Sequence, residues 1–239
     1  MIVFDQVTKT YRGLPQPALQ AVSFAVPAGS VTGFLGPNGA GKSTAMRILM
    51  GLASADSGSA RIAGSAYRDL PDPAATAGSL LEADQFHPAR SGRESLRLSC
   101  LTLGLPAARA DEVLELVGLP PRDAKRQVRG YSLGMRQRLG VAHALLTDPP
   151  VLVLDEPANG LDPQGQRWLG DLLRARAERG GTVLLSSHQL AEVERLADRL
   201  VVIAGGELVA DDSPARLRAE LGDITDFYFS VTAGPNRAA

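Results

Sequence analysis

A glycine-rich segment at residues 36–44, GPNGAGKST, constrains the fold of this chain more than any other feature. It follows the apolar run Val31–Leu35 and precedes a helical pattern at residues 45–52, which is the strand, loop and helix order of a phosphate-binding loop. Glycines let backbone N–H groups converge on an anion, and the following helix adds the positive end of its dipole. A glycine-rich turn without a ligand is the alternative, but the complete pattern in this context is highly specific. The segment therefore predicts a site for nucleotide phosphates.

Side chains that suit a magnesium nucleotide occur in this loop and after a later strand. Lys42 is expected to reach the β- and γ-phosphates, and the Ser43 hydroxyl to bind Mg²⁺. Asp155 and Glu156 directly follow the apolar run Val151–Leu154, which places them at the carboxyl end of a buried strand, where ligands bind in open α/β sheets. Asp155 is expected to hold Mg²⁺, often through water, and Glu156 to polarise the water that attacks the γ-phosphate. Alone, such an acidic pair fits a solvated turn about equally well.

One of the three histidines has a predicted role in the same site. His188 follows an expected strand at residues 182–187, so its imidazole emerges at the same edge of the sheet as Glu156. It is a candidate sensor of the γ-phosphate. His87 and His143 are interpreted as structural or exposed.

The order of predicted elements indicates an α/β protein. Short β-rich segments, separated by Pro and Gly, lie at residues 2–4, 21–26, 31–35 and 60–63. A helical pattern at residues 91–119 has apolar side chains at Leu96, Leu103, Val113, Leu116 and Val117. Helices are then expected at residues 133–146, 163–178 and 189–197, and strands at 151–154, 182–186 and 200–203. Such alternation builds a parallel sheet covered by helices.

The last part of the chain gives weaker signals. Residues 204–207 predict a hairpin turn, and Ser213 followed by Pro214 predicts the start of a final helix. No element is predicted after Gly222.

Composition limits the class of protein. The 239 residues are 44% hydrophobic and 21% charged with a formal net charge of −1, as in ordinary globular proteins, and nothing indicates nucleic-acid binding. A single large α/β domain is favoured. No apolar run approaches the roughly 20 residues that span a bilayer, and the N-terminus lacks signal-peptide features, so a cytoplasmic location is expected. The single cysteine, Cys100, is expected to be buried on a helix, which weakly indicates a reducing compartment.

From Tyr11 to about Glu207 the chain resembles the ATP-binding cassette (ABC) family, whose motifs occur here in the family's order. Residues 9–11 look like the aromatic loop that stacks on adenine, and residues 36–44 look like the Walker A loop. The signature corresponds to residues 132–138 and the Walker B motif to residues 151–156. The dimer-contact loop corresponds to residues 160–162 and the switch histidine to residues 187–188. The resemblance implies a P-loop NTPase with a RecA-like parallel-sheet core, an N-terminal antiparallel β subdomain and a helical signature subdomain. That domain would span residues 1–222, with the helical part at about 88–148, leaving a C-terminal tail at 223–239.

The same resemblance implies ATP and Mg²⁺ as cofactors and assigns residues to them. The implied ATP-binding residues are Tyr11, Gly36, Pro37, Asn38, Gly39, Ala40, Gly41, Lys42, Ser43 and Thr44. The implied catalytic residues are Glu156, His188 and Lys42, and the implied metal ligands are Ser43, Asp155 and Glu82. Ser132 and Gly134 would act on the nucleotide of a second subunit, and Asp162 would contact that subunit.

Two departures from the family pattern narrow the resemblance. Residues 131–135 read YSLGM instead of the usual LSGGQ, so Ser132 and Gly134 are kept while the glutamine contact is lost at Met135. Glu82 stands where the family normally has a metal-contacting glutamine, with Gln85 as the alternative under a shifted alignment. Together these features resemble the bacitracin and lantibiotic resistance branch, which exports peptides or drugs.

The implied function is that of an ATP-hydrolysing subunit that powers a separately encoded membrane permease. Its partners would be the permease and a second nucleotide-binding subunit, in a homodimer or a heterodimer on the inner face of the membrane. A soluble ABC-type ATPase acting on ribosomes or DNA is the alternative, but those proteins have tandem cassettes or coiled-coil insertions, and this chain has one phosphate loop and no heptads. A regulatory module without hydrolysis would lack Glu156 or His188, and both are present.

A basic stretch before the signature has two interpretations. It contains Arg122, Lys125, Arg126 and Arg129. A solvated face is the simpler interpretation, and contact with a partner is the other.

Overall fold

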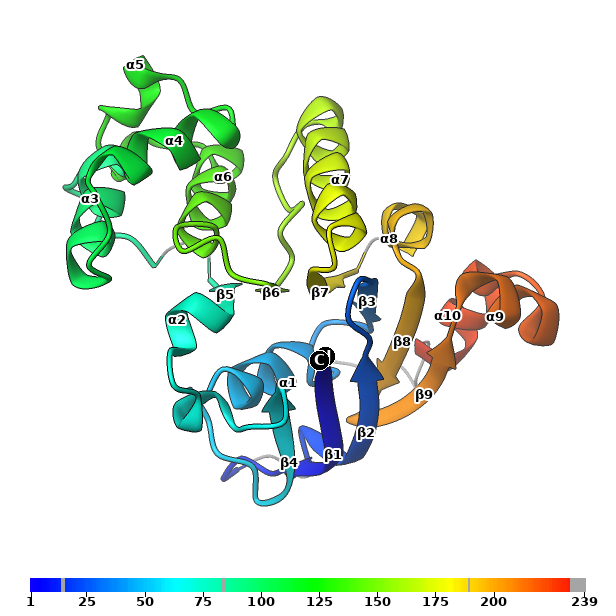
Figure 1. Cartoon of the computed structure of the whole chain (residues 1–239). Coiled ribbons are helices and arrows are strands. Elements are labelled where there is room, and N and C mark those ends of the chain that lie inside the picture. The colour runs from blue at the N-terminus through cyan, green and yellow to red at the C-terminus, as the bar shows by residue number, and fades with distance from the viewer. Residues whose placement is uncertain (14–15, 83–84, 189, 233–239) are drawn as a thin grey trace.

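The computed structural model describes residues 1–13, 16–82, 85–188 and 190–232 (Figure 1). Within these residues a six-stranded sheet has the strand order β5-β6-β7-β3-β8-β9. Its strands are β5 (Ala77–Leu80), β6 (Val151–Leu154), β7 (Thr182–Ser187), β3 (Val31–Leu35), β8 (Arg199–Ala204) and β9 (Glu207–Asp212). Neighbouring strands are parallel except β8 and β9. Strands β3, β6 and β7 are buried on both faces of the sheet along their whole length, which is why most of their residues are apolar.

A second, antiparallel sheet lies at the opposite end of the molecule from the green helices in Figure 1. It consists of β1 (Ile2–Lys9), β2 (Leu19–Val26) and β4 (Ser57–Ile62) in the order β2-β1-β4. Phe4 stacks on Phe24 with ring centroids 4.4 Å apart, and Phe24 contacts Phe34 of the larger sheet. The antiparallel β subdomain is therefore confirmed, with longer strands than the sequence predicted.

Helices flank the larger sheet as the alternating pattern predicted. They are α1 (Lys42–Leu49), α7 (Pro163–Glu178) and α8 (Leu190–Leu196). The predicted first residue of the last of these, Gln189, lies outside the described residues. The expected parallel sheet covered by helices is thus confirmed.

The expected helical subdomain follows β5 and gathers at one end of the molecule (Figure 1, green). Its helices are α3 (Gly92–Thr102), α4 (Ala108–Leu116), α5 (Pro121–Ala124) and α6 (Leu133–Ala144). A capping box between Ser91 and Glu94 starts α3, and Cys100 is buried on it as predicted. Helix α6 lies close against β5, because a Cβ at Gly140 would come within 2.4 Å of Leu80. The chain also forms three short helical turns: η1 (Tyr67–Asp69) and α2 (Pro73–Thr76) precede β5, and η2 (Val128–Gly130) lies between α5 and α6.

The C-terminal region contains two helices, of which the sequence predicted one. Helix α9 (Pro214–Leu221) begins at the Ser213 cap as expected. The residues assigned to a tail then form α10 (Ile224–Thr232). Ile224 and Tyr228, one turn apart, are buried in the same core cluster as Val193 of α8. This helix therefore belongs to the packed domain.

Candidate nucleotide site

The loop at residues 36–44 adopts a conformation that requires its glycines. Gly39 and Gly41 have positive φ angles of 82° and 109°, which residues with a side chain rarely adopt. A Cβ at Gly41 would also lie 2.2 Å from the carbonyl oxygen of Ala18. The loop leads into the N-terminus of α1, where unpaired N–H groups favour an anion.

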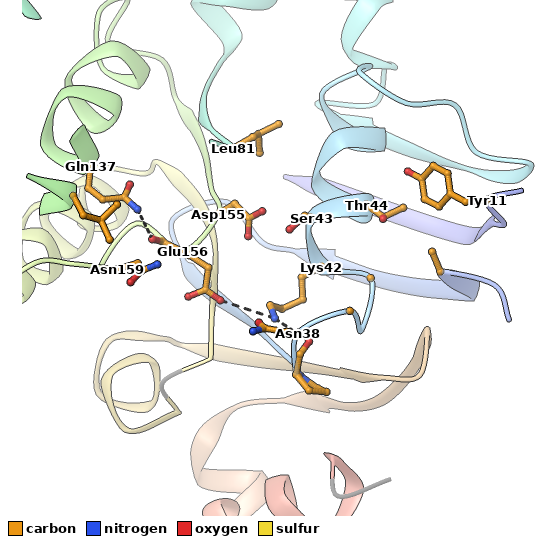
Figure 2. A pocket seen from close by; sticks show the side chains of 15 residues that line it. Tyr11, Asn38, Lys42, Ser43, Thr44, Leu81, Gln137, Asp155, Glu156 and Asn159 are labelled. Carbon is orange, nitrogen blue, oxygen red and sulfur yellow. Dashed lines mark hydrogen bonds and ion pairs between the residues drawn. The ribbon is translucent and has the colours of Figure 1, made fainter. Parts of the chain in front are cut away.

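Lys42 lies buried inside this loop. Its ammonium donates hydrogen bonds to the carbonyls of Gly36 at 2.5 Å and Pro37 at 3.2 Å, and it lies 3.9 Å from a carboxylate oxygen of Glu156. Burial lowers the pKa of Lys42, and the charges of Glu156 and Asp155 offset part of this effect. The ammonium is thus held at the bottom of the loop and compensated by oxygen atoms (Figure 2).

Glu156 has an unusual backbone conformation, with φ of 48°. Its N–H donates to the Ser186 hydroxyl at 2.9 Å, and its carbonyl accepts from the Gln137 side-chain amide at 3.1 Å. Its carboxylate lies 2.7 Å from Nδ1 of His188. Ser186 in turn donates to the carboxylate of Asp155. Partners from α6 and β7 therefore hold the strained backbone and both carboxylates in place.

These groups border an open pocket of about 470 Å³. Figure 2 shows Lys42, Asn38 and Glu156 on one side and Ser43 beside Asp155 on the other. Of the predicted site residues, those lining the pocket are Tyr11, Pro37, Asn38, Gly39, Gly41, Lys42, Ser43, Thr44, Asp155 and Glu156. Gly36 and Ala40, the remaining two predicted residues of the loop, are buried. The sequence did not predict the lining residues Ala18, Leu81, Leu133, Gln137 and Asn159.

The pocket offers a donor set that fits Mg²⁺. The Ser43 hydroxyl and the Asp155 carboxylate line the same cavity from α1 and from the end of β6. Both are oxygen ligands, which Mg²⁺ prefers, and a metal that keeps waters and phosphate oxygens needs only one or two protein ligands. The residues present therefore suit a metal bound together with a triphosphate.

Glu82 is not brought to this pocket. Its carboxylate forms an ion pair with Arg47 of α1, and the side chain is 60% exposed. The neighbouring Leu81 lines the pocket instead, and Gln85 is exposed. The structure thus places Glu82 with a cation of α1 and apart from Ser43 and Asp155.

Ser132 of the signature caps a helix. The Ser132 hydroxyl accepts a hydrogen bond from the N–H of Met135 at 3.3 Å, at the start of α6. Gly134 lies against the next loop, since a Cβ there would come within 2.6 Å of the Gly160 carbonyl oxygen. Asp162 caps α7 by accepting from the N–H of Gly165 at 2.8 Å. These residues lie at helix starts, and their contacts to a second subunit stay a prediction.

A family model described as ABC transporter matches residues 19–159 of the chain. The match covers more than half of the sequence and includes the phosphate loop and the two carboxylates that follow β6. This chain belongs to the ABC transporter family. It contains the ATP-binding cassette of that family, so the expected fold class is confirmed.

Named relatives of this cassette are transport proteins. The bacitracin transport ATP-binding protein BcrA of Bacillus licheniformis is 40% identical over 88% of this chain and 69% of its own length. The Nod factor export ATP-binding protein I of Paraburkholderia xenovorans is 38% identical over 95% of this chain and 76% of its own length.

A solved bacterial ABC transporter cassette has the same fold. Its dimeric structure matches with a TM-score of 0.82 and 26% identity, over 90% of this chain and 99% of that one. A dimeric structure of the same cassette in a post-hydrolysis state, bound to ADP and Pi, matches with a TM-score of 0.82 and 25% identity.

Proposed function

We propose that this cassette is the ATP-hydrolysing subunit of an ABC transporter and drives a separately encoded membrane permease. One observation carries the proposal: Glu156, with its strained backbone, lies 3.9 Å from Lys42 and 2.7 Å from His188. A lysine for phosphate and a carboxylate for water thus meet at one pocket, and a histidine contacts this carboxylate. A module that only bound nucleotide would need neither the Glu156 carboxylate nor the His188 contact.

Nucleotide binding would begin at the phosphate loop. The N–H groups of the loop and of the first turn of α1 would contact the β- and γ-phosphates, and Lys42 would exchange carbonyl oxygens for phosphate oxygens. Ser43 and Asp155 would hold Mg²⁺, which supplies positive charge against the charge that develops on the phosphates. Tyr11, at the rim of the pocket, would stack on adenine.

Hydrolysis would depend on Glu156. Its carboxylate would accept a hydrogen bond from the attacking water and orient it in line with the γ-phosphate. His188, 2.7 Å from this carboxylate, would fix its rotamer and contact the γ-phosphate. Release of the γ-phosphate would remove one partner of His188, which links the state of the nucleotide to α8.

The second subunit would complete each site. Ser132 caps α6, so the free N–H groups of that helix start could bind the γ-phosphate held by a partner copy. Asp162 and its loop would lie at the same interface. The dimeric relatives support this arrangement. Since Met135 replaces the usual glutamine, the contact would consist of the Ser132 hydroxyl and backbone N–H groups.

A permease would dock on the apolar surface between the core and the helical subdomain. Leu52, Leu98, Leu101 and Leu103 are large apolar side chains that are 38% to 77% exposed. Leu103 and Tyr67 border a groove of about 250 Å³ there. In the described part of the chain, no helix has the length and apolar composition to cross a bilayer. Bound to its permease, the chain would work at the cytoplasmic face of the membrane, and the names of the bacitracin transport and Nod factor export relatives favour export of a drug, a peptide or a similar molecule.

Co-expression with the membrane proteins encoded beside its gene tests this proposal. We expect one of them to copurify and to stimulate ATP turnover in liposomes severalfold. Leu101→Glu should reduce this stimulation without changing the turnover of the isolated chain, and Leu116→Glu, an exposed site on α4, is the matched control. Sedimentation with ribosomes or DNA, with no membrane protein bound, would instead support the soluble alternative.

A further inference from the structure

A carboxylate between α1 and β4 holds the segment that leads to Tyr11. One carboxylate oxygen of Asp56 accepts from the Lys9 ammonium at 2.9 Å, and the other accepts from the backbone N–H of Thr10 at 2.6 Å. The N–H of Asp56 donates to the carbonyl of Thr8 at 2.8 Å. Asp56 is therefore tied at three points to the end of β1, directly before Tyr11.

Lys9 extends this network to the aromatic ring. Its ammonium lies 5.5 Å from the centroid of the Tyr11 ring, within the range of a cation–π contact. Only 16% of the Lys9 side chain is exposed, whereas Tyr11 is 37% exposed at the rim of the pocket. Because Tyr11 lies outside the packed core, its orientation depends on such local contacts.

A purely structural role for Asp56 is the simpler alternative. It would only close the ladder between β1 and β4, and an ion pair whose carboxylate is open to solvent adds little to stability. However, both of its carboxylate oxygens are bound by the two residues that precede Tyr11. The Lys9 hydrogen bond and the Thr10 N–H also hold the pKa of this carboxyl below its usual value, so it stays ionised near neutral pH. The contacts of Asp56 with Lys9 and Thr10 therefore restrain the position of the Tyr11 ring as well as the pairing of β1 with β4.

We propose that Asp56, acting through Lys9 and Thr10, is a positioning residue that fixes the Tyr11 ring as the platform for adenine. The proposal rests on the proposed function, in which Tyr11 stacks on the base of ATP. Lys9 covers one face of the ring, which leaves the opposite face for the base. Recognition of the base then depends on Asp56, while phosphate binding depends on the loop at residues 36–44.

Calorimetric titration with MgADP and with magnesium pyrophosphate separates these two dependences. Both ligands carry a diphosphate and only one carries a base. We expect Asp56→Ala to weaken MgADP binding about threefold to tenfold and to leave pyrophosphate binding within about twofold. Tyr11→Ala should weaken MgADP binding at least as much. Asp69→Ala, which removes an exposed carboxylate on η1, is the matched control and should change neither affinity.

The double variant decides whether Asp56 acts through the ring. If it does, Asp56→Ala in the Tyr11→Ala background causes no further loss of MgADP affinity. Additive losses, or an equal loss of both ligands in Asp56→Ala, would overturn the proposal. If Tyr11→Ala left MgADP affinity unchanged, the platform itself would be wrong, while pyrophosphate binding would still support the phosphate site of the proposed function.

A second variant covers the case in which Asp56→Ala folds poorly. Lys9→Met removes the ammonium from the ring and leaves the bond between Asp56 and Thr10 in place. We expect a loss of MgADP affinity of about twofold to fivefold, with pyrophosphate binding unchanged. A loss of both affinities, with a melting curve like that of the wild type, would contradict the proposal.

Discussion

Glu156 combines a strained backbone with the chemistry proposed for it. A non-glycine residue at a φ of 48° costs about 1 kcal/mol or more, so the surrounding contacts must maintain it. Glu156→Gln keeps the shape of the side chain but removes the carboxylate that would orient water. We expect turnover to fall at least about a hundredfold, while the MgATP dissociation constant stays within about threefold. Single-turnover hydrolysis and equilibrium binding measure the two effects, with the exposed Glu178→Gln as control. Wild-type turnover in this variant would mean that another group activates the water.

Gln137 gives a second prediction for the same carboxylate. Its amide nitrogen donates to the Glu156 carbonyl, while its buried amide oxygen has no hydrogen-bond partner among the described residues. Gln137→Leu keeps most of the volume and removes the donor, so the Glu156 carbonyl keeps only its bond from the backbone N–H of Asn159. We expect turnover to fall about tenfold with nearly unchanged MgATP affinity. In the Glu156→Gln background the same change should have no effect on the residual rate. An equal further loss there would show that Gln137 acts elsewhere.

The residues of this site were predictable to different degrees. Lys42, Ser43, Asp155 and Glu156 stand in short motifs whose spacing fixes their position, and the structure places all four around the pocket. Gln137 and Ser186 have no such signal, because their role depends on the packing of α6 and β7 against the end of β6. The ion pair of Glu82 could not be predicted either, since Arg47 comes from a different element.

At the scale of elements, the ion pair between Glu82, two residues after β5, and Arg47 of α1 predicts how Glu82 acts. Arg47 lies one helical turn, about 5.4 Å, beyond Ser43 on α1, so Glu82 would have to move by about a turn to reach a metal bound at Ser43. Both side chains of the pair are exposed, and such a pair contributes at most about 1 kcal/mol, so it is easily broken. Glu82→Gln should therefore leave the MgATP dissociation constant within about threefold and change the stimulation of turnover by the permease. Arg47→Met, which frees Glu82, is the companion variant. A large loss of MgATP affinity with normal stimulation would contradict this view.

Helix α6 carries a histidine whose burial predicts a dependence of stability on pH. His143 is partly buried, its ring lies edge-on to Phe86 at 5.8 Å, and burial lowers its pKa. Above the ordinary histidine pKa of about 6.5 both states are neutral, and as pH falls below it the unfolded chain gains the proton first. The free energy of unfolding should therefore fall as pH decreases, by at most about 1.4 kcal/mol per pH unit from this residue, until the folded state is protonated as well. Urea unfolding between pH 5 and 8 should show a shallower dependence of the unfolding free energy on pH for His143→Gln than for the wild type.

Elements with strong local patterns were predicted well, and those defined by tertiary contacts were not. The strand VLVL is apolar throughout and VTGFL has Thr32 as its single polar side chain, so their burial could be predicted from the residues alone. Helix α10 mixes buried Ile224 and Tyr228 with Thr225, Asp226 and Ser230 in one short segment. Its helical form depends on the apolar surface formed by α8, α9 and β8, which lie near one another only in the folded chain.

At the scale of the whole molecule, the pocket is open to solvent. The phosphate loop leads into α1, whereas Ser132 of the signature lies at the start of α6. The proposed dimer would bring Ser132 of one copy to the phosphate loop of the other. Turnover by the isolated chain should then rise faster than linearly with protein concentration, because two copies form each active site. Measurement of the ATPase rate from nanomolar to micromolar protein tests this. Strict proportionality over the whole range would indicate that a monomer is sufficient.

Mixing two inactive variants tests the shared site more directly. Ser132→Asp keeps a good helix cap, because aspartate caps as well as serine, but it places a negative charge against the γ-phosphate of the partner. Glu156→Gln keeps the signature and loses the carboxylate for water. In a mixed dimer, the site at the phosphate loop of the Ser132→Asp copy has its own intact Glu156 and receives an intact signature from the other copy. With random pairing, half of the dimers are mixed and each has one intact site of two, so the mixture should regain about one quarter of wild-type turnover. The control is each variant alone at the same total concentration. If the mixture stays as inactive as its components, Ser132 and Glu156 act within the same copy, and the two-subunit site is wrong for this protein.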